Sequence, residues 1–100
     1  MTYMAPEIKL GRKYDGKQVD IFSLGVVLFI LVVGIFPFQQ ARSDDYFYKM
    51  LLNGQTQKYW SKLDPKNQLS EEFKSLMESI FSFDGSKRPT LSQIVNGPWL

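Results

Sequence analysis

One long apolar segment, residues 21–38, restricts the possible folds more than any other feature of the sequence. It reads IFSLGVVLFILVVGIFPF, and Ser23 is its only polar side chain. No helical or strand period is visible in it, so the segment is apolar on every side. Its length of 18 residues favours a helix over a strand, although its many β-branched residues favour a strand. Gly34 and Pro37 are expected to end the helix.

Two environments would suit such a helix: a membrane and the centre of a soluble domain. The length is at the lower limit of a transmembrane span, and Lys9, Arg12, Lys13 and Lys17 precede it, which favours a cytoplasmic N-terminal side. Against a span, two glycines and a proline interrupt the segment. The amphipathic helices of the remaining chain also need an apolar partner. The residues alone favour the core helix and leave the membrane span open.

The sequence that follows predicts three more helices. Ser43-Asp44-Asp45 is a plausible N-cap and first turn of a helix that stops at Asn53-Gly54. Ser70 is expected to cap the next helix. The apolar face of that helix comprises Phe73, Leu76, Met77, Ile80 and Phe81. Thr90-Leu91-Ser92-Gln93 fits the capping box of a last short helix that ends at Asn96-Gly97.

The segments between these helices are predicted to be loops. Residues 5–17 are expected to form a short helical turn followed by a polar loop, and residues 55–69 a polar loop that holds Tyr59 and Trp60. Asp84-Gly85 predicts a turn. Four helices therefore follow a loop-rich start, and no segment is a good strand. The predicted fold class is mainly α.

The composition excludes several kinds of site. The 100 residues include no cysteine and no histidine, which rules out disulfides, thiol nucleophiles, Cys/His zinc sites and a Ser-His-Asp triad. A net charge of +2 without a run of basic residues gives no sign of nucleic-acid binding. The hydrophobic share of 44% argues against disorder. The first residues lack the pattern of a signal peptide, and a soluble, cytoplasmic location is expected.

Five short motifs occur in order along the chain. They are Ala5-Pro6-Glu7, Asp20-Ile21-Phe22-Ser23-Leu24-Gly25, Gly34-Ile35-Phe36-Pro37-Phe38, Arg88-Pro89-Thr90 and Asn96-Gly97-Pro98-Trp99. They resemble the Ala-Pro-Glu, Asp-x-Trp-Ser-x-Gly, Gly-x-x-Pro-Phe, Arg-Pro-Ser/Thr and His-Pro-Trp/Phe motifs of eukaryotic Ser/Thr protein kinases. Phe22 replaces the usual Trp, and Gly97 the usual His. Each motif alone is weak, but their order and spacing make the resemblance specific.

The resemblance implies a fold and a place within it. Residues 1–100 resemble a partial kinase domain, from the Ala-Pro-Glu motif to the last helix, without the N-terminal lobe, the catalytic loop and the Asp-Phe-Gly segment. The implied architecture is the C-terminal, large lobe, a helical bundle around a buried apolar central helix, and this favours the core helix over the membrane span. Residues 45–54 and the pair Tyr59-Trp60 are most similar to calcium/calmodulin-dependent kinases.

The implied activity is the transfer of a phosphoryl group from ATP, with Mg²⁺, to serine or threonine of a protein substrate. No catalytic, nucleotide-binding or metal-binding residue of the family is present in this chain, and Phe83-Asp84-Gly85 lies too late in the chain to be the Asp-Phe-Gly motif. We therefore expect the chain to be inactive alone, with no nucleic-acid or membrane partner. A non-catalytic binding module of the pseudokinase type and, less favoured, a small single-span membrane protein are the alternatives.

Structural roles are implied for Glu7, Arg88 and Asp20. The resemblance implies that Glu7 and Arg88, 81 residues apart, form a buried ion pair, whereas composition alone makes both of them surface charges. Asp20 is expected at the start of the apolar helix. There it would face the helix dipole, and in the family it accepts backbone N–H groups of the catalytic loop.

Substrate docking is implied for two short stretches. Tyr3 and Met4 match the family's substrate-binding loop just before Ala-Pro-Glu. Asp44 and Asp45 could attract a basic peptide, although capping of the following helix is the simpler interpretation.

Overall fold

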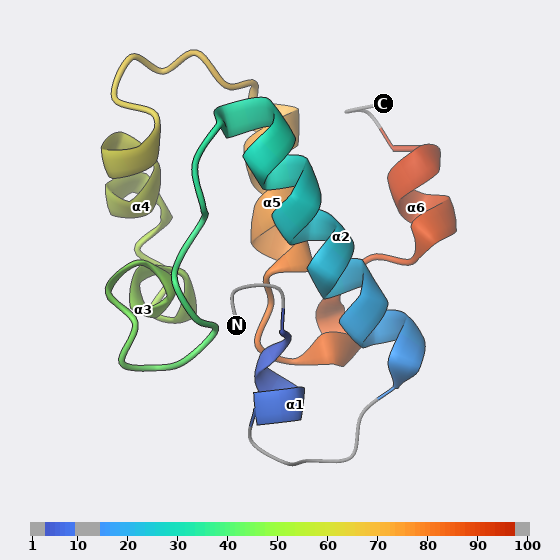
Figure 1. The fold of residues 1–100 in the computed structure, drawn as a ribbon. Coiled ribbons are helices and arrows are strands. Elements are labelled where there is room, and N and C mark those ends of the chain that lie inside the picture. Colours follow the sequence, from blue (N-terminus) through green and yellow to red (C-terminus); the bar gives the residue numbers. More distant parts are fainter. Residues whose placement is uncertain (1–3, 10–14, 98–100) are drawn as a thin grey trace.

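The computed structural model describes residues 4–9 and 15–97, and helices joined by loops make up this part of the chain (Figure 1). The elements are α1 (Pro6–Lys9), α2 (Gly16–Val33), α3 (Tyr46–Leu52), α4 (Thr56–Leu63), α5 (Glu71–Ile80), the 3-10 helix η1 (Gly85–Lys87) and α6 (Leu91–Val95). Within these two stretches no residue lies in a strand. The mainly α prediction is therefore confirmed.

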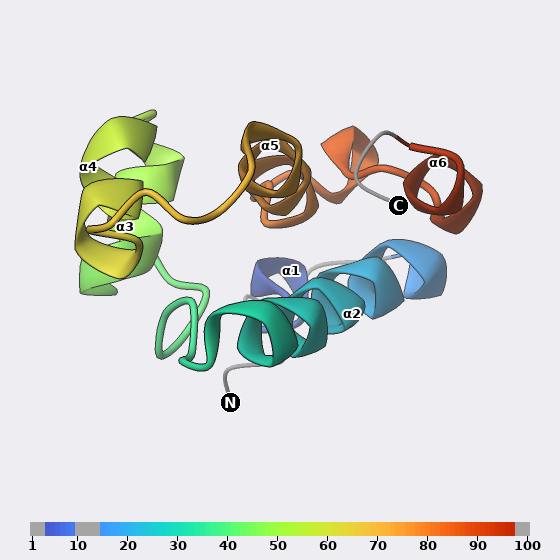
Figure 2. The same ribbon diagram turned by 90° about the horizontal axis from the view of Figure 1, so that it is seen from above.

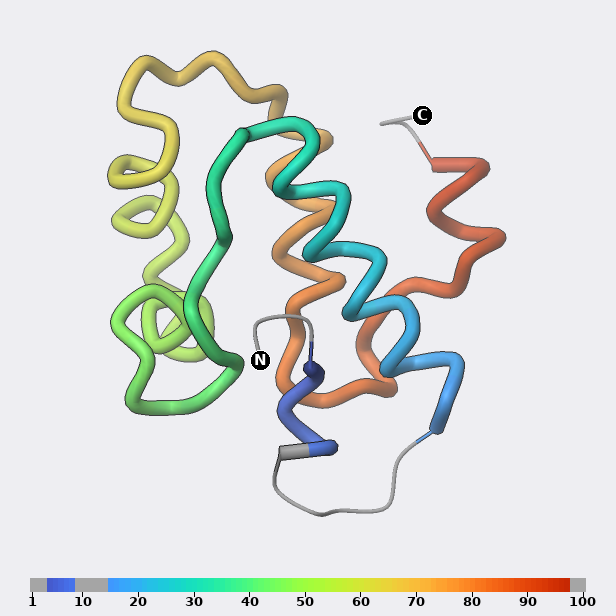
Figure 3. Tube along the Cα trace, viewed as in Figure 1, coloured from blue at the N-terminus to red at the C-terminus, as the bar shows by residue number. Residues whose placement is uncertain are grey.

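Helices α2 and α5 lie side by side in the middle of the molecule. Helices α3 and α4 lie on one side of them and α6 on the other (Figure 1). Seen from above, α2 lies in one layer and α5 in another, so one side of α2 faces α5 and the opposite side faces away from it (Figure 2). The connection from α2 to α3 passes close to α4 on its way (Figure 3). The apolar segment is thus the central helix.

Helix α2 begins earlier than predicted. Asp15 is its N-cap and accepts a hydrogen bond from the N–H of Lys17 at 2.8 Å. Gly34 ends the helix with a φ of 88°, a left-handed conformation that glycine adopts without steric cost. The prediction of a helix with Gly34 at its end is confirmed, but its start at residue 21 is wrong. The β-branched residues lower the helix propensity of this segment only slightly, and packing against α5 outweighs that effect.

Aromatic rings fill the space between α2 and its neighbours. Phe29 is fully buried, and its ring stacks on that of Trp60, with the ring centroids 5.9 Å apart. Phe22 is equally buried and contacts Phe38 and Phe81 at centroid distances of 5.9 and 5.5 Å. Such ring pairs stabilise a core beyond the area they bury. One side of α2 therefore contributes the apolar segment's residues to the core.

The other side of α2 is exposed. Leu31 is 76% exposed, and Val27 and Val32 are also exposed. Among the described residues, α2 is the one helix long and apolar enough to span a membrane, with a mean hydropathy of 1.9, and 33% of its residues are buried. The core helix of a soluble protein can be equally long and equally apolar. Ile35 and Phe36 extend the exposed apolar face beyond the helix end.

We expect this apolar face to make the isolated chain self-associate as its concentration rises, because exposed contiguous apolar surface favours association. Leu31→Glu should reduce the association without loss of helicity, since the side chain is largely solvent-exposed. Leu91→Glu is the matched control, because Leu91 is 57% exposed on α6, another part of the fold. Sedimentation velocity over a concentration series measures the effect. A chain that stays monomeric throughout would contradict the prediction.

The predicted polar loop over residues 55–69 is wrong in its first half. Residues Thr56–Leu63 form α4, with Tyr59 and Trp60 buried. The helix was missed because Gln55, at its N-cap, makes no side-chain capping bond and because few apolar residues mark its inner face. Tyr59 fixes the helix by donating its hydroxyl to the carbonyl of Pro37 at 2.9 Å.

The remaining helix predictions are confirmed. Asp45 caps α3, and the Ser70 hydroxyl accepts the N–H of Phe73 at the start of α5. Thr90 and Gln93 form the predicted capping box of α6: the Thr90 hydroxyl accepts the Gln93 N–H at 3.1 Å and the Gln93 side chain accepts the Thr90 N–H at 2.8 Å. Short-range cap chemistry therefore located these three helices in the sequence.

Candidate functional site

Arg88 forms the centre of a buried polar cluster. Its side chain is fully buried, and its two terminal nitrogens donate to the two carboxylate oxygens of Glu7 at 2.7 and 2.8 Å. It also donates to the carbonyl oxygens of Gln18 at 3.1 Å and Ser82 at 3.0 Å. The guanidinium carbon lies 4.9 Å from the centroid of the Phe22 ring. The structure thus brings Glu7 and Arg88 together in a bidentate pair, the strongest geometry for these groups.

Gly85 makes room for this pair. It is buried in η1, and a Cβ atom there would lie 2.6 Å from Oε1 of Gln18 and 2.7 Å from Oε2 of Glu7. Asp84 caps η1 by accepting the N–H of Ser86 at 3.0 Å. The sequence indicated only a turn at this point. The requirement for glycine comes from residues that are distant in the chain, so no local signal could have revealed it.

Asp20 lies away from the start of α2, so its expected position at the helix N-terminus is wrong. The helix begins at Gly16 with Asp15 as its cap, and Asp20 is exposed in the second turn. No described residue donates a hydrogen bond to its carboxylate. Asp20 faces a pocket of about 620 Å³ between the first turns of α2 and the segment before α6, lined also by Lys17 and Leu91. An acceptor beside an open pocket is available to donors from another chain segment.

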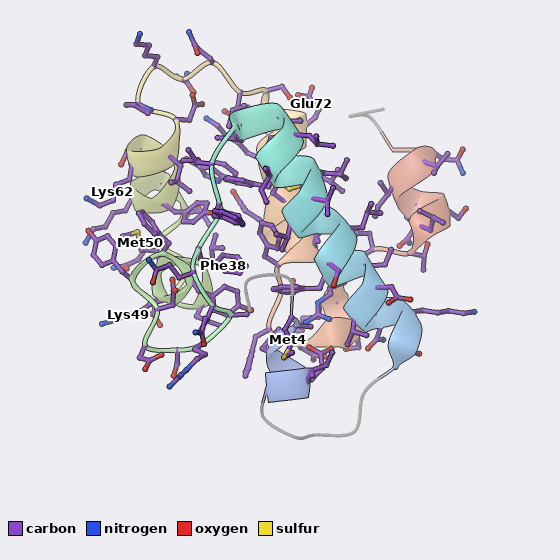
Figure 4. The ribbon with its side chains drawn as sticks, viewed as in Figure 1. Met4, Phe38, Lys49, Met50, Lys62 and Glu72 are labelled. Carbon is purple, nitrogen blue, oxygen red and sulfur yellow. The ribbon has the colours of Figure 1, made fainter. Side chains whose placement is uncertain are left out.

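The residues predicted to dock substrate lie in separate places. Tyr3 falls outside the described residues. Met4 is partly buried and lies two residues before the start of α1 (Figure 4). Asp44 is exposed and pairs with exposed Arg42 at 3.2 Å. The docking roles of these residues stay predictions.

The carboxylate of Asp45 joins the start of α3 to the connection from α2. One of its carboxylate oxygens accepts the N–H groups of Phe47 and Tyr48, both at 3.1 Å. The other accepts those of Gln39 and Gln40 at 3.0 and 2.9 Å. The carboxylate therefore both caps α3 and ties it to the connection from α2. These four bonds support the capping interpretation of Asp45.

A second buried ion pair, between Lys74 and Asp64, was not identified from the sequence. The ammonium of Lys74 lies 3.4 Å from an Asp64 oxygen and donates to the side-chain oxygen of Asn67 at 2.8 Å. The two charged side chains are 10% and 7% exposed. Asp64 also accepts the N–H groups of Gln68 and Leu69. The pair fixes the loop between α4 and α5 onto α5.

Acidification should weaken this link. Burial raises the pKa of the Asp64 carboxyl, but hydrogen bonds from the N–H groups of Gln68 and Leu69 and from Lys74 outweigh it and hold the pKa below the ordinary 3.8. Because the folded-state pKa is lowered, the stability that Asp64 contributes is present above its ordinary pKa and is lost as the pH falls through the folded value. Urea unfolding at a series of pH values from about 6 to about 2 measures this loss of stability. Asp64→Asn should flatten the decline, and identical curves for both proteins would contradict the prediction.

Among the described residues, acidic side chains do not gather into a metal-binding group. No group of three or more acidic side chains in the described part of the chain could hold a metal ion. Glu7 is already paired with Arg88, and Asp45 with four backbone groups. The clusters that are present hold chain segments together, which is a scaffolding role.

Comparisons with known proteins agree on one family. The family model described as the protein kinase domain matches residues 1–100. The chain is 40% identical over 100 residues to the human SNF-related serine/threonine-protein kinase, covering all of this chain and 12% of that protein. It is 38% identical over 99 residues to the probable serine/threonine-protein kinase MARK-A of Dictyostelium discoideum, covering 99% of this chain and 9% of that protein.

The structural comparison agrees. A crystal structure of the Rad53 kinase domain and SCD2 matches with a TM-score of 0.70 and 28% sequence identity. The match covers 98% of this chain and 36% of that chain. The chain therefore spans about a tenth of the length of the two relatives above and about a third of the chain in the solved structure.

Proposed function

The chain belongs to the protein kinase domain family, and we propose that it is the C-terminal part of a domain that phosphorylates serine and threonine in proteins. The ion pair between Glu7 and Arg88 carries the proposal. It joins two of the family's motifs across 81 residues, as the buried ion pair that the resemblance implies. In this role the chain holds the segment around Glu7 against the later helices and presents a surface on which a protein substrate docks.

The proposed chemistry needs residues from outside the chain. The family implies ATP and Mg²⁺ as cofactors, and the proposal is that segments outside this chain hold both. We therefore propose that the 100 residues alone do not transfer phosphate. Asp20, exposed beside its pocket, is proposed to position the missing catalytic loop by accepting its backbone N–H groups.

The proposal includes a location, partners and a subgroup. A cytoplasmic location and a protein substrate are proposed, with Tyr3, Met4, Asp44 and Asp45 as docking residues and with neither a nucleic acid nor a membrane as partner. The calcium/calmodulin-dependent subgroup is proposed from residues 45–54 and Tyr59-Trp60. Stimulation of a kinase containing this chain by calcium and calmodulin tests the subgroup, and activity that ignores both would exclude it.

A chimera tests the main proposal. This chain would replace the 100 aligned residues of the human SNF-related kinase, and transfer of labelled phosphate to a generic protein substrate would be measured. We expect the chimera to phosphorylate serine and threonine, and the free chain to show no transfer. A chimera carrying Arg88→Met should lose most of the activity. A chimera carrying Arg42→Met, in which an exposed pair is broken, should retain it.

The alternative of a non-catalytic binding module predicts a different result. A chimera that folds, as judged by a cooperative unfolding transition, but transfers no phosphate would favour that module. Phosphate transfer by the free chain would contradict the proposal that catalysis needs further segments.

A further inference from the structure

Helices α3 and α4 carry three lysines and one exposed aromatic ring on a shared surface. Tyr46 and Lys49 lie one turn apart on α3, and Lys58 and Lys62 lie one turn apart on α4. The ammonium of Lys62 lies 5.6 Å from the centroid of the Tyr46 ring, so the residue pair on α3 adjoins the pair on α4. Lys49 and Lys62 both lie on the outer side of these helices (Figure 4). We call these four residues the lysine surface.

The lysine surface has no acidic residue of its own. Residues 46–63 contain three lysines and neither Asp nor Glu. Elsewhere in the described chain, Arg42, Lys74 and Arg88 each pair with a carboxylate. No described carboxylate forms an ion pair with Lys49, Lys58 or Lys62. Three ammonium groups without an ion-pair partner among the described residues therefore lie together on α3 and α4.

The buried side of α4 holds these lysines in place. The Tyr59 hydroxyl donates to the carbonyl of Pro37 at 2.9 Å, and the Trp60 indole N–H donates to the carboxylate of Glu78 at 2.8 Å. These two bonds fix the rotation of the helix about its axis. Lys58 and Lys62, both exposed, consequently project from a fixed helix face.

We propose that the lysine surface binds an acidic peptide segment of a partner protein. Carboxylates spaced along the peptide pair with the three ammonium groups, and the Tyr46 ring, in a residue that is 58% exposed, receives an apolar side chain. A nucleic acid is disfavoured because the surface holds no arginine and a single exposed ring. A membrane is disfavoured because only Tyr46 and Leu52 among the large apolar residues of α3 and α4 are exposed.

Fluorescence anisotropy of a short labelled polyglutamate peptide, titrated with the full chain, tests the proposal. We expect binding that weakens with added salt and is absent for a polyglutamine peptide. The double variant Lys58→Gln, Lys62→Gln should bind about tenfold more weakly, because each exposed ion pair contributes up to roughly fivefold. The matched control is Lys17→Gln, Lys87→Gln, which removes the same charge from other exposed positions and should change affinity less than about twofold.

Arginine at positions 58 and 62 provides a second control. Lys58→Arg with Lys62→Arg keeps the charge and should keep the affinity, whatever the glutamine variant does to folding. Equal losses in the glutamine variant and in its matched control would show attraction by net charge alone and overturn the proposal. Absence of polyglutamate binding would also overturn the proposal. Tighter binding of a single-stranded oligonucleotide, or of phosphatidylserine vesicles, would assign the surface to another class of partner.

Discussion

Replacing Arg88 with methionine should lower the free energy of unfolding by about 3–5 kcal/mol, the cost of breaking a buried ion pair from one side. The substitution leaves the carboxylate of Glu7, only 12% exposed, without its partner. It also removes the donor from the carbonyl oxygens of Gln18 and Ser82. Urea unfolding at low protein concentration, followed by tryptophan fluorescence, measures the loss.

Two controls separate burial from charge. Arg42→Met removes an arginine from an ion pair whose side chains are 56% and 70% exposed, and it should cost less than about 1 kcal/mol. The double variant Glu7→Leu, Arg88→Met should be more stable than Arg88→Met, because it leaves no unpaired buried charge at this site. Equal losses for Arg88→Met and Arg42→Met would show that burial of the Arg88 pair is energetically unimportant.

Replacing Gly25 with alanine should cost about 3 kcal/mol, at the upper end of overpacking penalties. A Cβ atom at this position would overlap Cγ2 of Ile80, and it would lie 3.3 Å from Cε1 of Phe81. Inside a helix, alanine is about 1 kcal/mol more favourable than glycine, so helix propensity alone would make this substitution stabilising. A net loss of stability would therefore report the close approach of α2 and α5. The same urea unfolding experiment measures it.

The control for Gly25 is another glycine of α2. Nothing lies within 4 Å of a Cβ atom placed on Gly16, so Gly16→Ala should be neutral or slightly stabilising. Ile80→Ala in the Gly25→Ala background should cost less than in the natural chain, because it removes the overlapping methyl group. Strictly additive losses would mean that the two residues do not press on each other.

Local chemistry made most of the helices predictable. Ser70 and Thr90 have the side chains that cap helices, and both caps form as expected. Gln55 has no such signal, and α4 behind it was missed. The first turn of α2 was missed for a different reason: Asp15 has a capping side chain, but Asp15-Gly16 resembles a loop and the continuous apolar run begins only at Ile21.

The polar clusters were harder to predict because their partners are far apart in sequence. Glu7 and Arg88 are residue types that are mostly exposed, and the resemblance to kinases, rather than their local sequence, placed them together. Nothing marked Asp64 and Lys74, whose pairing depends on the fold of the loop between α4 and α5. Asp45 was recognised as a cap, but its bonds to Gln39 and Gln40 require the return of the connection from α2.

The contact between Glu7 and Arg88 also constrains the order of events during synthesis. A ribosome adds about 5–20 residues each second, so Glu7 is made about 4–16 s before the arginine that holds it. Until then α1 lacks its main attachment to the later helices. Synthesis of Arg88 therefore secures α1, and a nascent chain stopped before residue 88 leaves α1 without that attachment.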